Sequence, residues 1–127
     1  MGNDGKNIDK NLKFELAMAK WRNKRPRDLT RLSRPAEQIT DLSPLADLTK
    51  LTTLYLNGNQ ITDISPLLEN QTDLTELGLN NNKITDLSPL ADLTNLTRLL
   101  LGENQITDVS PLAGLTNLTT LNLYDNK

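Results

Sequence analysis

The stretch LTTLYLNGNQITD, at residues 51–63, returns along this chain of 127 residues with small changes. It is repeated as LTELGLNNNKITD at 74–86 and LTRLLLGENQITD at 96–108, and a last copy, LTTLNLYDNK, begins at residue 118. The second half of the unit, Asp-[LIV]-Ser-Pro-Leu, begins at Asp41, Asp63, Asp86 and Asp108. Self-similarity at a period in the low twenties predicts stacked coils and not an ordinary globular fold.

The repeats divide the chain into two parts. We expect an N-terminal tail and capping helix at residues 1–28 and a repeat array at residues 29–127. The units of the array are 29–50, 51–73, 74–95, 96–117 and the partial unit 118–127. One domain is the natural count for this length, and an array gains stability unit by unit as coils are added.

Leucines two residues apart indicate which side of each unit faces inward, because alternate residues of an extended segment share a face. These pairs are Leu54 and Leu56, Leu77 and Leu79, Leu99 and Leu101, and Leu121 and Leu123. A single coil cannot bury so much leucine, so neighbouring coils must stack. Each coil is expected to close with a short 3₁₀ turn at its Ser-Pro pair, with Ser as the N-cap and Pro in the first helical position.

An asparagine stands at the ninth position of four units: Asn59, Asn82, Asn104 and Asn126. The asparagine amide has two donor hydrogens and one acceptor oxygen. An unsatisfied buried polar group costs about 1–3 kcal/mol. We therefore expect a structural ladder that satisfies backbone groups where the chain leaves each strand, with a binding role as the alternative.

The pattern N-x-[IL]-x-D-[LIV]-x-P-L resembles the leucine-rich repeat family, most closely the short 22-residue class of bacterial internalins. The resemblance covers about residues 29–127. It implies an α/β leucine-rich repeat solenoid, a right-handed horseshoe with a concave parallel β-sheet and short turns on its convex side. It also implies protein binding without catalysis, at a secreted or cell-surface location.

The composition narrows the function further. No histidine and no cysteine is present, which removes most nucleophile–base pairs and transition-metal sites. The aspartates recur with the repeat, which is typical of turns and caps. We expect no enzyme activity, cofactor, metal or small-molecule substrate. The polar start MGNDGKNIDKN lacks the apolar region of a signal peptide, so the compartment stays open, and no apolar run is long enough to span a membrane.

The first part of the chain has a different character. Residues 10–23 follow a helical pattern with Phe14, Met18 and Trp21 on one side, which predicts a cap over the first coil. A partner-binding amphipathic helix is the alternative. A basic run at 20–34 suits a helix C-terminus, and binding of nucleic acid or an anionic surface is the less favoured alternative. Only one aromatic residue lies within the run, too few for the stacking of single-stranded bases. In the second unit, an extra residue predicts a convex bulge near Leu68.

Outward strand positions predict the surface that can bind. Three columns are expected: Arg31, Thr53, Glu76, Arg98 and Thr120; Ser33, Tyr55, Gly78, Leu100 and Asn122; and Pro35, Asn57, Asn80, Gly102 and Tyr124. Interfaces are enriched in Tyr, Trp and Arg. The candidate protein-binding residues are Tyr55, Glu76, Arg98, Leu100 and Tyr124. A scaffold face without a partner is the alternative.

The last unit, residues 118–127, suggests a second kind of contact. Its strand, around Leu121, Leu123 and Tyr124, is expected to expose a sheet edge and the open end of the leucine interior. Exposed edge strands pair with other chains. We therefore expect either a longer array, of which this is a fragment, or a homodimer joined through this edge, so that the chain acts as a scaffold or assembly element.

Overall fold

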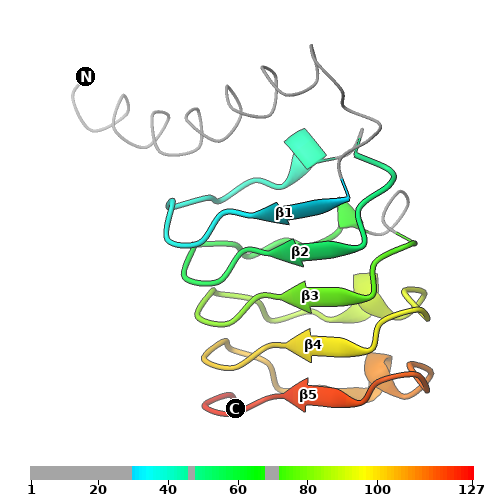
Figure 1. The fold of residues 1–127 in the computed structure, drawn as a ribbon. Helices are drawn as coiled ribbons and strands as arrows, with labels where there is room; N and C mark the ends of the chain where they lie inside the picture. Colours follow the sequence, from blue (N-terminus) through cyan, green and yellow to red (C-terminus); the bar gives the residue numbers. More distant parts are fainter. Residues whose placement is uncertain (1–29, 46–47, 68–71) are drawn as a thin grey trace, which may run out of the picture.

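The computed structural model describes residues 30–45, 48–67 and 72–127 of the chain (Figure 1). The expected capping helix at 10–23, the part of the basic run before residue 30 and the expected bulge near Leu68 lie outside these residues.

Each coil contributes one short strand, and the strands form one parallel sheet in sequence order, from β1 to β5 (Figure 1). The strands are β1 (Arg31–Ser33), β2 (Thr53–Tyr55), β3 (Glu76–Gly78), β4 (Arg98–Leu100) and β5 (Thr120–Asn122). The 3₁₀ turns on the other side of the coils are η2 (Ser43–Leu45), η3 (Ser88–Leu90) and η4 (Ser110–Leu112). This arrangement confirms the predicted solenoid with a parallel sheet on one side and short turns on the other.

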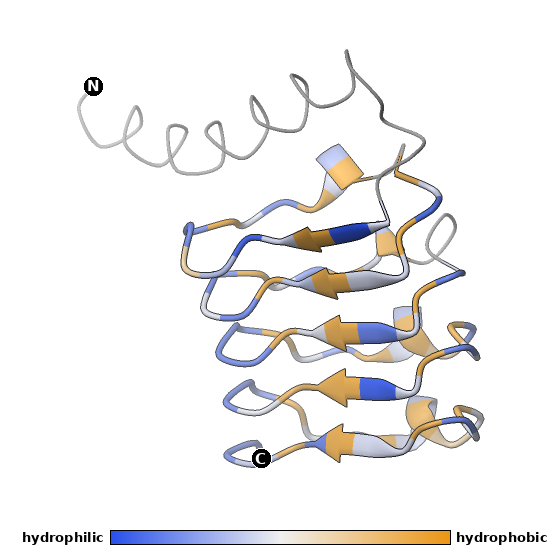
Figure 2. Ribbon diagram, in the orientation of Figure 1, coloured by the Kyte–Doolittle hydropathy of each residue, from blue (hydrophilic) through white to orange (hydrophobic). Residues whose placement is uncertain are grey.

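The strands pair in the register that the repeats predict. Leu54 lies opposite Leu32 on one side and opposite Leu77 on the other. Leu77 pairs with Leu99, which in turn pairs with Leu121. Equivalent leucines of successive coils are therefore neighbours, and Figure 2 shows hydrophobic residues at the same place in strand after strand.

The interior of the solenoid consists of leucine and isoleucine. In the second coil, Leu54, Leu56, Ile61 and Leu67 have no exposed surface, and their equivalents in the third coil are equally buried. Burying one such side chain contributes about 1.5–3 kcal/mol relative to leaving it in water. Because each coil supplies only part of this interior, the coils are stable by stacking, as expected of repeat arrays.

The 3₁₀ turns form at three of the Ser-Pro pairs, whereas the pair at 65–66 lies in a turn that is not 3₁₀, so the prediction of a 3₁₀ turn is wrong there. The predicted capping role of serine is also wrong. The N-cap residues of η3 and η4 are Leu87 and Val109, whose side chains make no capping hydrogen bond. Ser88 is instead the first residue of η3, and its backbone N–H donates to Oδ1 of Asp86 at 2.9 Å. The repeated aspartate, two residues before the serine, therefore satisfies the first N–H group of the turn.

Candidate functional site

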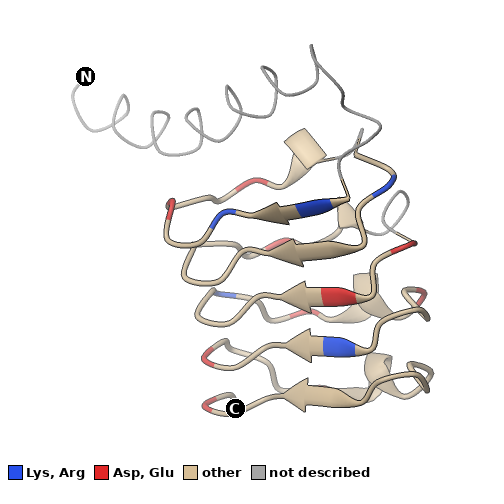
Figure 3. Ribbon diagram, in the orientation of Figure 1, with Lys and Arg blue, Asp and Glu red and all other residues tan. Residues whose placement is uncertain are grey.

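The concave face, which we define as the outward side chains of β1 to β5 and of the two residues after each strand, follows the three expected columns. Thr53, Glu76 and Arg98 are register partners in the first column, and Tyr55, Gly78 and Leu100 in the second. Figure 3 shows that the charges on this face do not repeat, since β1 and β4 each carry a basic residue and β3 an acidic one. The leucines behind it repeat in every strand, so the variation is confined to the exposed side.

Tyr55 is held in place by two contacts with the neighbouring coil. Its hydroxyl donates to Oε1 of Glu76 at 2.5 Å. Its ring lies over Gly78, where an added Cβ would collide with Cδ1 of the ring. The absence of a side chain at Gly78 thus makes room for the ring. Glu76 bonds this tyrosine, although its register partner in β4 is Arg98.

Tyr124 repeats this arrangement in the opposite direction. Its hydroxyl donates to Oε1 of Glu103 at 2.6 Å, and a Cβ at Gly102 would collide with its ring. Tyr55 leans toward the following coil, whereas Tyr124 leans toward the preceding one. The two rings therefore lie over adjacent coils, the Tyr55 ring over Gly78 of β3 and the Tyr124 ring over Gly102. The half-buried Leu100 of β4 is the register partner of Gly78.

The charges around the two tyrosines differ. The hydrogen bond to Glu76 raises the pKa of the Tyr55 hydroxyl, and partial burial adds to this, while the charges of Arg98 and Arg31 oppose it. The hydrogen bond to Glu103 likewise raises the pKa of Tyr124, and the charge of Asp125 adds to it. The surroundings of Tyr55 thus combine both signs of charge, and those of Tyr124 are negative.

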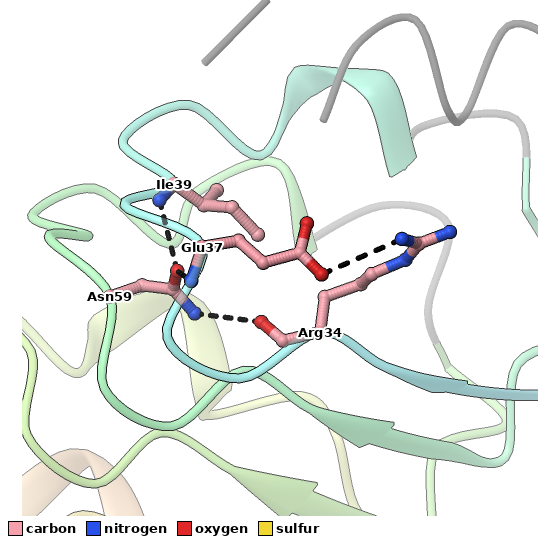
Figure 4. A network of polar contacts seen from close by, with 4 residues as sticks. All are labelled: Arg34, Glu37, Ile39 and Asn59. Atoms are coloured by element: carbon pink, nitrogen blue, oxygen red, sulfur yellow. Dashed lines mark hydrogen bonds and ion pairs between the residues drawn. The ribbon is translucent and has the colours of Figure 1, made fainter. Parts of the chain in front are cut away.

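The asparagine ladder lies at the end of the strands and inside the turn. Oδ1 of Asn59 accepts the backbone N–H groups of Glu37 and Ile39, each at 2.9 Å, and its Nδ2 donates to the carbonyl of Arg34 at 3.0 Å (Figure 4). Arg34 and Glu37 also form an ion pair, at 3.5 Å. The amide of Asn59 therefore joins the first coil to the second.

The ladder continues through the remaining coils with the same bonds. Oδ1 of Asn82 accepts the N–H of Ile61, and its Nδ2 donates to the carbonyls of Leu56 and Leu79. Asn104 and Asn126 make the equivalent bonds one and two coils further along. Asn59, Asn82 and Asn104 are buried, so their amides act on the backbone and are not presented to a partner.

Sequence reasoning missed a left-handed backbone position just before each ladder asparagine. The residues there have φ angles between +54° and +71°: Gly58, Asn81, Glu103 and Asp125. In the first coil, which has no ladder asparagine, Ala36 and Gln38 have φ angles of +56° and +59°. Gly, Asn and Asp tolerate this conformation best, so Gly58, Asn81 and Asp125 could have indicated it in the sequence. In Glu103 the left-handed turn occurs at the residue that binds the Tyr124 hydroxyl.

Two further columns of hydrogen bonds were not expected. Oδ1 of Asn57 accepts the N–H of Asn80 at 2.8 Å, and Oδ1 of Asn80 accepts the N–H of Gly102 at 2.6 Å. A threonine ladder precedes the strands, where Oγ1 of Thr75 donates to the carbonyl of Thr52 and Oγ1 of Thr97 to that of Thr75. The signal for both was the recurrence of the residue type at one position of the repeat.

The β5 edge carries the residues expected for self-association. Leu121 is 45% exposed and Tyr124 is 47% exposed, whereas Leu123 is half-buried. Ile106, Val109 and Leu123 line a shallow groove beside this strand. The edge thus exposes both apolar side chains and one side of a strand.

The described residues hold no group of three or more His, Cys, Asp or Glu side chains placed to bind a metal ion. In the same part of the chain, no helix has the length and apolar character needed to cross a membrane.

Comparison with known proteins agrees with this architecture. A family described as leucine-rich repeats, in two copies, matches residues 36–69 and 94–127, which make up more than half of the chain. The chain therefore belongs to the leucine-rich repeat proteins. A comparison with curated protein sequences finds no match.

Among solved structures, the chain is similar to internalins. It is 51% identical to an internalin (inlF) from Listeria monocytogenes, with a TM-score of 0.76, over 79% of this chain and 29% of that one. For internalin C2 of the same organism the identity is 52% and the TM-score 0.66, over 68% and 38% of the two chains. A leucine-rich repeat protein from Leptospira interrogans is 31% identical, with a TM-score of 0.72, over 79% and 26%. The chain thus spans well under half of each of these structures, and its repeat is of the internalin type.

Proposed function

We propose that the chain is a protein-binding module that holds its partner on the concave face. Internalin-like leucine-rich repeat proteins generally mediate protein–protein interactions. The observation that supports this face is the contrast between the two sides of each strand. The inward residues repeat as leucine, whereas the outward ones change to Tyr55, Glu76 and Arg98, residue types suited to recognition.

The geometry gives these residues a fixed arrangement. Tyr55 and Tyr124 are each bound to a glutamate and seated over a glycine, so a partner meets rings that are already ordered. Ordering a free side chain on binding costs about 0.5–1.5 kcal/mol, which this arrangement reduces. Leu100, the register partner of Gly78, adds a half-buried apolar side chain to this face.

A photo-crosslinking experiment tests the proposal. A photoreactive amino acid replaces Leu100 on the concave face or, as the matched control, the exposed Asp92, which follows η3 on the other side of the coil. Exposure to a mixture of extracellular proteins should give a covalent adduct from position 100, and the paired substitutions Tyr55→Ser and Arg98→Ser should remove it. Equal adducts from both positions, or an adduct that survives the two substitutions, would show that the concave face is not the binding surface.

A second candidate function is self-association through the β5 edge, in which a second copy of the chain pairs with this strand. The exposure of Leu121 and the groove beside Leu123 favour it, because an uncovered edge strand recruits another strand. Light scattering at high protein concentration should give a dimer that Leu121→Lys abolishes and Tyr55→Ser leaves intact. A monomer at every concentration would exclude this assembly.

A further inference from the structure

The two tyrosine–glutamate pairs of the concave face have different electrostatic surroundings, since arginines lie near the first pair and only carboxylates near the second. Arg31 and Arg98, both exposed, lie close enough to Tyr55 to act on its hydroxyl. Tyr124 is instead influenced by Glu103 and Asp125, which are both exposed. The ion pair of the described residues joins Arg34 to Glu37, so within that part of the chain Glu103 and Asp125 have no cationic partner.

The two sets of charges lie at opposite ends of β4 and the residues that follow it. Arg98 is the first residue of β4, and Gly102, which the Tyr124 ring covers, stands four residues later. At about 3.3 Å per residue this is about 13 Å, which an extended chain covers in about four residues. The outward residue between them is the half-buried Leu100, and the Tyr55 ring lies beside it over Gly78 of β3.

We propose that the concave face binds an extended segment of the partner protein that runs along β4, from Arg98 toward Gly102. An acidic side chain of this segment lies beside Arg98 and Tyr55, and a basic side chain, about four residues away, lies on Tyr124 between Glu103 and Asp125. This inference rests on the proposed function and specifies the chemistry of the partner.

Two interactions attract the partner's basic side chain to Tyr124. One face of the Tyr124 ring covers Gly102, which leaves the other face toward the solvent and available to a cation. The carboxylates of Glu103 and Asp125 add a direct charge interaction. At the other end, the guanidinium group of Arg98 on β4 suits a carboxylate, since it presents paired donors in a plane.

Three peptides test the proposal by NMR. The probe is a capped nine-residue peptide of Gly and Ser with Glu at its third and Arg at its seventh position; the controls replace Glu by Gln or Arg by neutral citrulline. The probe should shift the backbone amide signals of Tyr55 and Arg98 and, separately, those of Glu103 and Tyr124. The Gln control should lose the first response and the citrulline control the second, each with a two- to fivefold weaker affinity, as expected for about 0.5–1 kcal/mol.

Protein variants show whether the ring position matters. Gly102→Ala, which displaces the Tyr124 ring, should remove the shifts of the Glu103 and Tyr124 amide signals and leave the shift at Tyr55. Gly114→Ala is the matched control, because nothing lies within 4 Å of an added Cβ there. Retained secondary structure by circular dichroism establishes that both variants fold, and Glu103→Gln provides a second test of the same end without changing the backbone.

The outcomes separate this inference from the proposed function. If the three peptides bind equally, if both charges map to one end, or if no signal shifts at about 10 mM peptide, the charge assignment is wrong. The concave face can still bind a partner of other chemistry in that case, as the crosslinking from position 100 then shows. Loss of that crosslink specificity would contradict the face itself, whichever peptide binds.

Discussion

The inner and outer sides of the same strands follow different rules. Behind the sheet, Leu54, Leu77 and Leu99 are identical, fully buried and in register. In front of it, their immediate neighbours Tyr55, Gly78 and Leu100 differ in size and polarity. A repeat that is kept on one side and varied on the other separates the residues that build the coil from those that are available for recognition.

The strongest test of this contrast compares adjacent residues of β4. Leu99→Ala removes a fully buried side chain and should lower the free energy of unfolding by about 2–5 kcal/mol, through lost burial and the cavity left behind. Leu100→Ala, on the half-buried outer side, should cost less than about 1 kcal/mol. Urea denaturation measures both values. Similar costs for the two variants would remove the distinction between the sides.

The second test concerns the asparagine ladder. Asn82→Ala leaves the N–H of Ile61 without its side-chain acceptor and removes one of the two amide donors to each of the carbonyls of Leu56 and Leu79, which should cost about 1–3 kcal/mol. Gln105→Ala, at an exposed position beside the equivalent Asn104, is the control and should change stability by less than about 0.5 kcal/mol. A loss below about 1 kcal/mol for Asn82→Ala in thermal or urea unfolding would contradict a structural role for the ladder.

The inner side could be predicted from the sequence because its signals repeat. The spacing of Leu54 and Leu56 gave the face, the period gave the register, and the recurrence of asparagine gave the ladder. Each of these arguments depends on local geometry that is the same in all coils. Only the cap of the 3₁₀ turn was assigned to the wrong residue, because serine and aspartate are both good capping residues and both recur.

The outer side could be predicted only as a set of columns. The sequence placed Glu76 beside Arg98, and the register agrees, but it did not show that Glu76 is bonded by Tyr55. The direction in which a tyrosine leans depends on which neighbouring position is glycine, and this requires knowledge of contacts between coils. The left-handed residues escaped for a similar reason, since Ala36 and Glu103 are not typical of that conformation.

A third test examines the seat of Tyr55. Gly78→Ala places a Cβ against the ring and should cost about 1–3 kcal/mol through overpacking, or less if the ring moves away. Movement of the ring breaks the hydrogen bond to Glu76, so the pKa of Tyr55 should fall toward its ordinary value. Ultraviolet titration of the phenol measures this shift, with Gly114→Ala as the control. An unchanged titration would mean that Gly78 does not position the ring.

The smallest effect is expected at the aspartate caps of the 3₁₀ turns. The backbone N–H of Ser88, followed by its side chain, lowers the pKa of Asp86 below the ordinary value. The stability from this carboxylate is therefore present above the ordinary pKa and lost as the pH falls through the lowered one. Asp86→Ala should be slightly less stable than the parent at pH 7 and equal to it in strong acid, as followed by thermal unfolding.

The variant Asp86→Asn, which keeps an acceptor oxygen for Ser88 but carries no charge, isolates the electrostatic part. It should lie between the parent and Asp86→Ala at neutral pH. A difference between parent and Asp86→Ala that stays constant across the acid range would show that the charge contributes nothing.

The order of the strands has a consequence for how the molecule comes apart. Among the described residues, β2 pairs with β1 and β3, β3 also pairs with β4, and β4 with β5, so the sheet joins only adjacent coils. We therefore expect single coils to unfold while the remaining coils stay folded. Amide hydrogens of β3, which has neighbours on both sides, should exchange with solvent more slowly than those of β5. Exchange rates that change gradually from coil to coil would support this stepwise unfolding.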